Sequence, residues 1–71
     1  MKNIILVSGG FDPIHQGHIK LIKEASKYGS VVVLLNSDEW LRKKKGKEFH
    51  NFAERKIIME SLKGVIEVIA F

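Results

Sequence analysis

Three short apolar runs constrain the fold of this chain more than any other feature of its sequence. They cover residues 3–8, 31–35 and 65–71, and all three are rich in the β-branched residues that favour strands. A continuous apolar run is typical of a parallel strand that is buried on both faces, which is the expectation for the first run. With helical patterns between the runs, the order β-α-β-α-β predicts an α/β fold with a three-stranded parallel sheet and right-handed crossovers.

Two helices are expected between the strands. Apolar residues recur at helical spacing over residues 19–28, and Gly29 marks the end of this helix. Asn51 and Glu54 have the spacing of a capping box and start the second helix, which Gly64 ends. The sequence therefore predicts three strands that are connected by two helical crossovers.

A basic segment lies between the second strand and the second helix. Residues 36–39 break the strand with turn and capping residues, and residues 40–50 are predicted to form a loop with one helical turn at its start. The formal charge of +4 comes mostly from residues 42–47, which read RKKKGK. Such a cluster attracts a polyanion, and charge alone does not choose between nucleic acid, a membrane surface and a small phosphorylated ligand.

Size and composition exclude several classes of protein. The 71 residues show no repeat and no domain boundary, and the absence of cysteine excludes disulfides and thiolate metal sites. No apolar run approaches the ~20 residues of a membrane span. The opening residues 1–4 lack the apolar core of a secretory signal, so a cytoplasmic location without membrane contact is expected.

The junction between the first strand and the first helix carries most of the chemical signal. Residues 9–18 read GGFDPIHQGH, which places His15 and His18 around Gly17 at a helix N-terminus. Unpaired N–H groups and positive partial charge make such an end favourable for anions. Glycines allow close approach of the backbone to phosphate, and imidazoles can donate hydrogen bonds to it. The pattern predicts a site for a nucleoside triphosphate.

The predicted topology brings the histidines and the basic segment together. Three strands and two helices make half of a doubly wound domain, in which ligands bind at the carboxyl ends of the strands. The histidine motif follows the first strand and the basic segment follows the second, so both should face one crevice.

These motifs resemble those of a known superfamily. Residues 9–18 carry the signature G-x-F-D-x-x-H-x-G-H of the nucleotidyltransferases, and residues 36–39, 45–46 and 54–55 follow in the order seen in the cytidylyltransferase-like branch, which includes glycerol-3-phosphate cytidylyltransferases. The resemblance implies a Rossmann-like fold. Residues 1–71 would form one nucleotide-binding domain, the N-terminal half of a doubly wound nucleotidyltransferase domain, truncated after the third strand.

The resemblance also implies an activity. Such enzymes transfer a nucleotidyl group from a nucleoside triphosphate to a phosphorylated alcohol or sugar and release pyrophosphate. Residues 37–39 and 45–46 favour CTP, while residues 11–14 also occur in adenylyltransferases that use ATP. Mg²⁺ is the expected ion, held mainly by the triphosphate and water rather than by a metal site of the protein.

Roles for individual residues follow from the same resemblance. His15 and His18 would contact the triphosphate as pyrophosphate leaves, and Lys45 would reach the α-phosphate. Arg55 would hold the β- and γ-phosphates, and Asp12 would face the acceptor or a metal. The other expected nucleotide-binding residues are Gly10, Phe11, Gly17, Lys44 and Lys47.

Plainer interpretations of these residues stay open. The histidines could be a surface metal pair or packing residues, and the lysine run could be a solvated loop. Arg55 could pair with a surface glutamate, and Asp38 is expected to be a cap or turn residue. Trp40 and Phe49 are expected in the core or the crevice wall.

The family's second phosphate-binding signature, an Ile-Ser-rich stretch after an arginine, is absent from these residues. The chain is thus a fragment, has a partner that supplies the rest, or has lost catalysis; a homodimer is also expected from relatives. A non-catalytic nucleotide-binding remnant remains an alternative. A nucleic-acid-binding module is disfavoured, because only charge argues for it.

Overall fold

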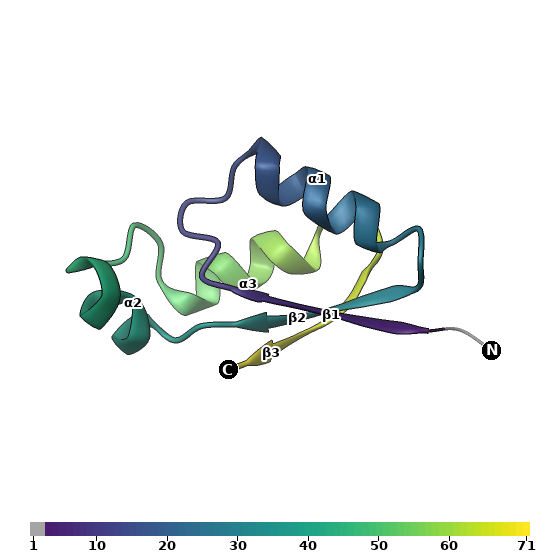
Figure 1. Cartoon of the computed structure of the whole chain (residues 1–71). Helices are drawn as coiled ribbons and strands as arrows, with labels where there is room; N and C mark the ends of the chain where they lie inside the picture. The colour runs from purple at the N-terminus through teal and green to yellow at the C-terminus, as the bar shows by residue number, and fades with distance from the viewer. Residues whose placement is uncertain (1–2) are drawn as a thin grey trace.

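A computed structural model describes residues 3–71 of the chain. Met1 and Lys2, which belong to the opening that predicted no signal segment, lie outside the described residues. The elements, in chain order, are β1 (Ile4–Gly9), α1 (Gln16–Ala25), β2 (Ser30–Leu35), α2 (Asp38–Lys45), α3 (Phe52–Glu60) and β3 (Val65–Ala70) (Figure 1). Within residues 3–71, no helix is long and apolar enough to cross a bilayer.

The strands form the predicted parallel sheet. In the described part of the chain the sheet has three strands in the order β1-β2-β3, with β2 in the centre. Val7 of β1 lies opposite Val33 of β2, which lies opposite Val68 of β3. All strands run the same way, so their carboxyl ends meet at one edge, beside α2 (Figure 1).

Helices α1 and α3 cover the same face of the sheet and close the core. Figure 1 shows both helices on one side of the strands. Val33 is fully buried at the centre of the sheet, Ile22 of α1 and Met59 of α3 pack into the same cluster, and Val7 and Val68 complete it from the outer strands. This arrangement confirms the α/β architecture predicted from the apolar runs.

The opposite face of the sheet exposes apolar side chains on its outer strands. It presents Ile4 and Leu6 of β1, which are 55% and 63% exposed, and Ile69 of β3, which is 40% exposed. The expectation that the first strand is buried on both faces is therefore wrong for the described residues. Side chains alternate between the faces of a strand, and α1 and α3 both lie on one face.

The predicted loop over residues 40–50 is wrong in its first half, where α2 makes two turns. Ser37 is the N-cap, and its Oγ accepts a hydrogen bond from the Trp40 amide at 3.0 Å. Acidic residues occupy the first turn and basic residues the last, which favours a helix through its dipole. Gly46, with a φ of 93°, ends the helix. The capping residues that break β2 therefore also start a helix.

The burial of side chains in the core predicts how substitutions in α3 change the free energy of unfolding. Met59 is fully buried whereas Ile57, two residues earlier on the same helix, is 67% exposed. Met59→Ala should lower the free energy of unfolding by about 2–5 kcal/mol because it leaves a cavity. Ile57→Ala should change it by less than ~0.5 kcal/mol. Denaturant titration of the two variants measures the difference, and equal effects would contradict this packing.

Candidate active site

The two histidines cap the first helix. His15 is the N-cap of α1, and its Nδ1 accepts a hydrogen bond from the Gly17 amide at 3.0 Å. His18 reaches back, and its Nδ1 accepts from the His15 amide at 3.2 Å. The pair forms a reciprocal capping box in which imidazoles replace the usual hydroxyl and carboxylate. The motif thus satisfies backbone donors at the helix start.

This capping fixes the tautomer of the neutral rings. A neutral imidazole whose Nδ1 accepts a hydrogen bond carries its proton on Nε2. The two rings stack with centroids 3.9 Å apart and planes at 27°, so this stacked pair carries two Nε2–H donors at a helix N-terminus. Such a pair matches the oxygens of an anion.

The electrostatics favour the neutral form of His18. Burial, followed by the neighbouring charge of His15, holds the pKa of His18 below its ordinary value of 6.5. Because the folded state disfavours the proton, the stability that neutral His18 contributes is present above its unfolded pKa and is lost as the pH falls through the lower folded value. Near neutral pH the ring is therefore a neutral donor through Nε2.

Gly17 and Phe11 position the histidine rings. A Cβ atom on Gly17 would lie 2.8 Å from Cε1 of His15, so only glycine lets this ring fold over the helix start. Phe11 is 6% exposed and has a φ of 50°, a left-handed conformation that costs a side-chain residue of order 1–3 kcal/mol. Its ring meets His18 edge-on at 4.9 Å between centroids. Both residues were expected to bind nucleotide, and here both support the histidines.

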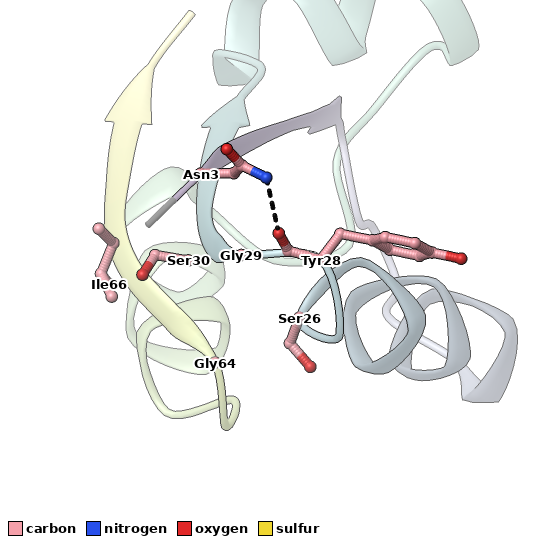
Figure 2. Close-up of a pocket in the computed structure, with 7 residues that line it drawn as sticks. All are labelled: Asn3, Ser26, Tyr28, Gly29, Ser30, Gly64 and Ile66. Atoms are coloured by element: carbon pink, nitrogen blue, oxygen red, sulfur yellow. Dashed lines mark hydrogen bonds between the residues drawn. The ribbon is translucent and has the colours of Figure 1, made fainter. Parts of the chain in front are cut away.

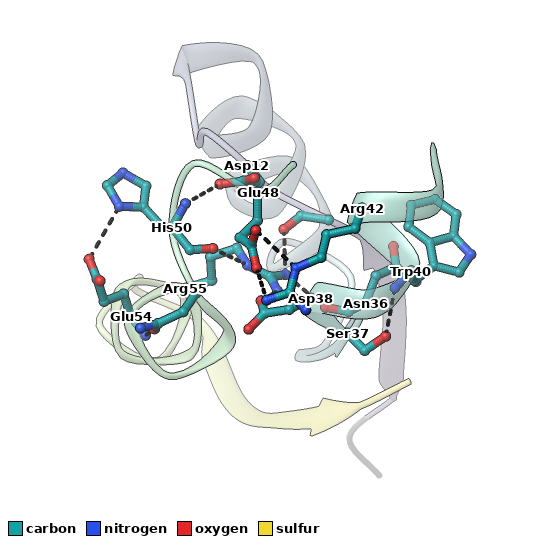
Figure 3. Close-up of polar contacts among 12 residues, drawn as sticks. Asp12, Asn36, Ser37, Asp38, Trp40, Arg42, Glu48, His50, Glu54 and Arg55 are labelled. Atoms are coloured by element: carbon teal, nitrogen blue, oxygen red, sulfur yellow. Dashed lines mark hydrogen bonds and ion pairs between the residues drawn. The ribbon is translucent and has the colours of Figure 1, made fainter. Parts of the chain in front are cut away.

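Arg55 joins the ends of the strands. Its side chain is buried, and its Nη1 donates to the carbonyl oxygens of Gly10 at 3.1 Å and Asn36 at 2.7 Å, just beyond β1 and β2 (Figure 3). Its Nε donates to the His50 carbonyl at 3.0 Å, and its Nη2 pairs with the Asp38 carboxylate at 2.6 Å. One guanidinium therefore connects two strand ends, the loop after α2 and the start of α2.

These contacts change the assignments made from sequence. The interpretation of Arg55 as a partner of a surface glutamate is wrong, because its ion-pair partner is Asp38 and its side chain is fully buried. Protein acceptors take four of the five N–H donors of Arg55, so its expected contact with the β- and γ-phosphates stays a prediction. The role of Asp38 as that partner was missed, and its position shortly after the second apolar run was the only signal in the sequence.

The charge state of Asp38 follows from the same contacts. Burial by itself raises the pKa of Asp38. The hydrogen bonds from Arg55 and from the Phe52 amide, with the charges of Arg55 and Arg42, outweigh burial and hold the pKa below 3.8. The ion pair is therefore intact at neutral pH and weakens only in acid, as the pH falls through the folded-state pKa.

The lysines of the basic segment lie in different surroundings. The Nζ atom of Lys45 pairs with the Asp12 carboxylate at 2.9 Å, which ties α2 to the loop that carries the histidines. The Nζ atom of Lys44 lies 5.4 Å from the ring centroid of Trp40, and Lys47 is exposed. Lys45 is thus the lysine of this run that the fold brings to the histidine loop.

Two aromatic residues that were expected in the core or crevice wall are exposed. Trp40 is 44% exposed and Phe49 is 63% exposed, which excludes the core. The Nζ atom of Lys45 lies 4.6 Å from the ring centroid of Phe49, so this ring borders the same edge of the sheet. Phe49 can therefore form part of a crevice wall.

A hollow in the surface lies at the other end of the sheet. A cavity of about 450 Å³ opens beside Asn3, Gly29 and Ser30, at the amino ends of β1 and β2 (Figure 2). None of the described residues that line it has a charged side chain. Ligands of parallel α/β sheets bind at the opposite edge, so this cavity is not the candidate site.

Metal binding by the protein alone has no support in the described residues. Between residues 3 and 71, no three His, Cys, Asp or Glu side chains are grouped closely enough to hold an ion. The surroundings fit Mg²⁺ only if the ion arrives with phosphate oxygens and water, which stays a prediction.

Comparison with known proteins agrees with this geometry. Residues 6–71 match the family described as Cytidylyltransferase-like. The chain is 41% identical over 70 residues to a glycerol-3-phosphate cytidylyltransferase of Bacillus subtilis (strain 168), covering 97% of this chain and 54% of that protein. It is 40% identical over 73 residues to the bifunctional protein HldE of Aliarcobacter butzleri (strain RM4018), covering 99% of this chain and 15% of that protein.

A solved structure has the same fold. The crystal structure of the lipopolysaccharide core biosynthesis protein from Thermoplasma volcanium GSS1 is 28% identical, with a TM-score of 0.89. The match covers 100% of this chain and 59% of that one. The chain therefore spans about half the length of the Bacillus relative and of this structural neighbour.

The contacts of Arg55 predict that its substitution greatly lowers the free energy of unfolding. Arg55→Met should lower the free energy of unfolding by on the order of 3–5 kcal/mol, because it leaves the Asp38 carboxylate and buried carbonyls without their donor. Lys56→Met is the control on the same helix, since Lys56 is 44% exposed and lies 3.9 Å from its partner Glu60. It should cost at most ~1 kcal/mol. Thermal and denaturant unfolding test this, and a small effect of Arg55→Met would remove Arg55 from its central place.

Proposed function

We propose that this chain, which belongs to the cytidylyltransferase-like family, forms the triphosphate-binding part of an enzyme that transfers CMP to a phosphorylated alcohol or sugar. The observation that carries the proposal is the stacked pair His15 and His18, whose shared capping of α1 uses both Nδ1 atoms and leaves the Nε2–H donors of the neutral rings free of the cap. Membership of the family supports nucleotidyl transfer as the reaction.

The proposed step is a direct displacement at phosphorus. An oxygen of the acceptor phosphate attacks the α-phosphorus of the triphosphate, and the bond from that phosphorus to the bridging oxygen of the β-phosphate breaks. Pyrophosphate leaves with the electron pair of the broken bond, so negative charge grows on the bridging oxygen. Such a reaction needs alignment and charge neutralisation rather than a protein nucleophile.

The residues of the site have distinct parts in this step. His15 and His18 donate through Nε2–H to the triphosphate and stabilise the growing charge of the leaving group. Lys45 brings a positive charge to the same edge of the sheet from α2, through its contact with the histidine loop. Mg²⁺ would be carried by the triphosphate and would neutralise further charge on the phosphates.

The nucleotide and acceptor are narrower proposals. The 41% identity to a protein described as a glycerol-3-phosphate cytidylyltransferase supports CTP and a small phosphorylated alcohol. ATP is the alternative, because residues 11–14 do not separate the two nucleotide classes.

Completion of the site needs a further layer. The chain spans 54% of the Bacillus relative, and the face of the sheet that carries Ile4, Leu6 and Ile69 exposes these apolar side chains. We propose that this face packs against additional polypeptide, from the same protein or from a second copy in a homodimer, and that the acceptor pocket forms there in part. Exposed apolar faces of this kind mark packing surfaces.

The histidine assignment is tested with a pair of substitutions at position 18. Asparagine places an oxygen near Nδ1 and can keep the cap to the His15 amide, but it lacks a donor at Nε2. His18→Asn should therefore lower pyrophosphate release by at least ~100-fold while keeping the melting temperature within a few degrees. His18→Ala should lose both activity and about 1 kcal/mol of stability, because the cap is gone.

The assay uses CTP or ATP with Mg²⁺ and a panel of phosphorylated alcohols and sugars. Full activity of His18→Asn would contradict the role of Nε2. CTP binding without turnover by the unsubstituted protein would instead support the non-catalytic nucleotide-binding alternative.

A further inference from the structure

Asp12 has a carboxylate that is fully occupied by the protein. Its side chain is 0% exposed. Its Oδ2 accepts a hydrogen bond from the Phe49 amide at 2.7 Å. Its Oδ1 accepts from the His50 amide at 2.8 Å (Figure 3). Lys45 adds an ion pair at 2.9 Å and a second hydrogen bond, to the backbone carbonyl of Asp12. The expected orientation of Asp12 toward an acceptor or a metal does not fit a buried carboxylate with these partners.

These contacts join two loops that are distant in the sequence. Asp12 lies three residues before His15, in the loop between β1 and α1. Phe49 and His50 lie 37 and 38 residues further along the chain, in the segment between α2 and α3. The carboxylate is thus a bracket that fixes the basic segment against the histidine loop.

The ammonium group of Lys45 contacts Asp12 but does not use all of its donors there. It has three N–H donors. Two are directed to Asp12, one to the carboxylate and one to the carbonyl oxygen, and the side chain remains 30% exposed. One donor and the charge are therefore available to an anion that approaches from solvent.

The contacts of the Asp12 carboxylate also reduce its electrostatic repulsion of a bound triphosphate. A carboxylate close to a triphosphate would repel it unless its own charge were neutralised. Burial by itself raises the pKa of Asp12, but hydrogen bonds from Phe49, Lys45 and His50 and the charge of Lys45 outweigh it and hold the pKa below 3.8. Asp12 is therefore ionised at neutral pH and already paired, so it adds little free negative charge to the site.

We propose that Asp12 is a positioning residue: it holds Lys45 and the segment of residues 46–50 beside the histidine pair, so that Lys45 meets the triphosphate in a fixed geometry. This role rests on the proposed function for its ligand. The fixing of the segment is a property of the free protein and can be measured without nucleotide.

The first test measures amide hydrogen exchange without nucleotide. Asp12→Asn keeps the size of the side chain but loses its charge and one acceptor. It should speed exchange of the Phe49 and His50 amides by about tenfold or more, since bonds to a charged acceptor are lost. Glu48→Gln is the control, because Glu48 lies in the same segment and pairs with Arg42 at 2.5 Å. It should leave these two amides within about threefold of the unsubstituted protein.

The second test measures coupling through CTP·Mg²⁺ kinetics. Asp12→Asn should raise KM for CTP about tenfold with a smaller change in kcat, and it should add almost nothing in a Lys45→Met background, because Asp12 acts through Lys45. If Asp12→Asn does not fold, Asp12→Glu, which keeps the charge but displaces the carboxylate, should raise KM in the same direction.

The outcomes separate this inference from the proposed function. If the Phe49 and His50 amides exchange at an unchanged rate in Asp12→Asn, Asp12 does not fix this segment and the inference is overturned. Additive effects with Lys45→Met, or a changed Mg²⁺ requirement, overturn positioning and favour direct contact of Asp12 with ligand or metal. If the unsubstituted protein binds neither CTP nor ATP, the proposed function fails and Asp12 loses its ligand, while faster exchange still supports the bracket itself.

Discussion

The buried guanidinium of Arg55 is the interaction on which the candidate site depends. Parallel strands end in carbonyl groups that the sheet no longer pairs, and a buried carbonyl without a donor is costly. Arg55 supplies donors to the carbonyls of Gly10 and Asn36, just beyond β1 and β2, and to the His50 carbonyl before α3. Asp38 neutralises the charge. Arg55 thereby connects the carboxyl ends of two strands where the two loops of the site begin.

At this edge of the sheet, the hydrogen bonds that cap the backbone also orient the groups that are proposed to contact the triphosphate. His15 and His18 satisfy amides at the start of α1 with their Nδ1 atoms, and this use of Nδ1 leaves the protons of the neutral rings on Nε2. Asp12 binds amides of the opposite loop in a similar way and carries Lys45 with it. Each group that would meet a triphosphate is thus oriented by hydrogen bonds that also hold the fold.

The sequence predicted the parts of the molecule that depend on local patterns. The β-branched runs located the strands, and Asn51 caps α3 as its spacing with Glu54 indicated. Helix α2 was missed because Leu41 is its one buried residue among those described, so it lacks apolar periodicity and depends on its cap and dipole. The partners of Arg55 and Asp12 come from segments far apart in the chain, and no local pattern shows which acceptors will surround a buried charge.

The most direct test of the account is a long-range ¹H–¹⁵N spectrum of the histidine side chains, recorded near neutral pH with and without CTP·Mg²⁺. We expect that the neutral rings of His15 and His18 both carry the proton on Nε2, and that these Nε2–H signals shift when CTP is added. His50, whose Nδ1 lies 3.2 Å from Glu54, is the internal control and should change much less. A proton on Nδ1 of either ring, or Nε2–H signals that do not shift when CTP is added, would contradict the proposed role of the two histidines.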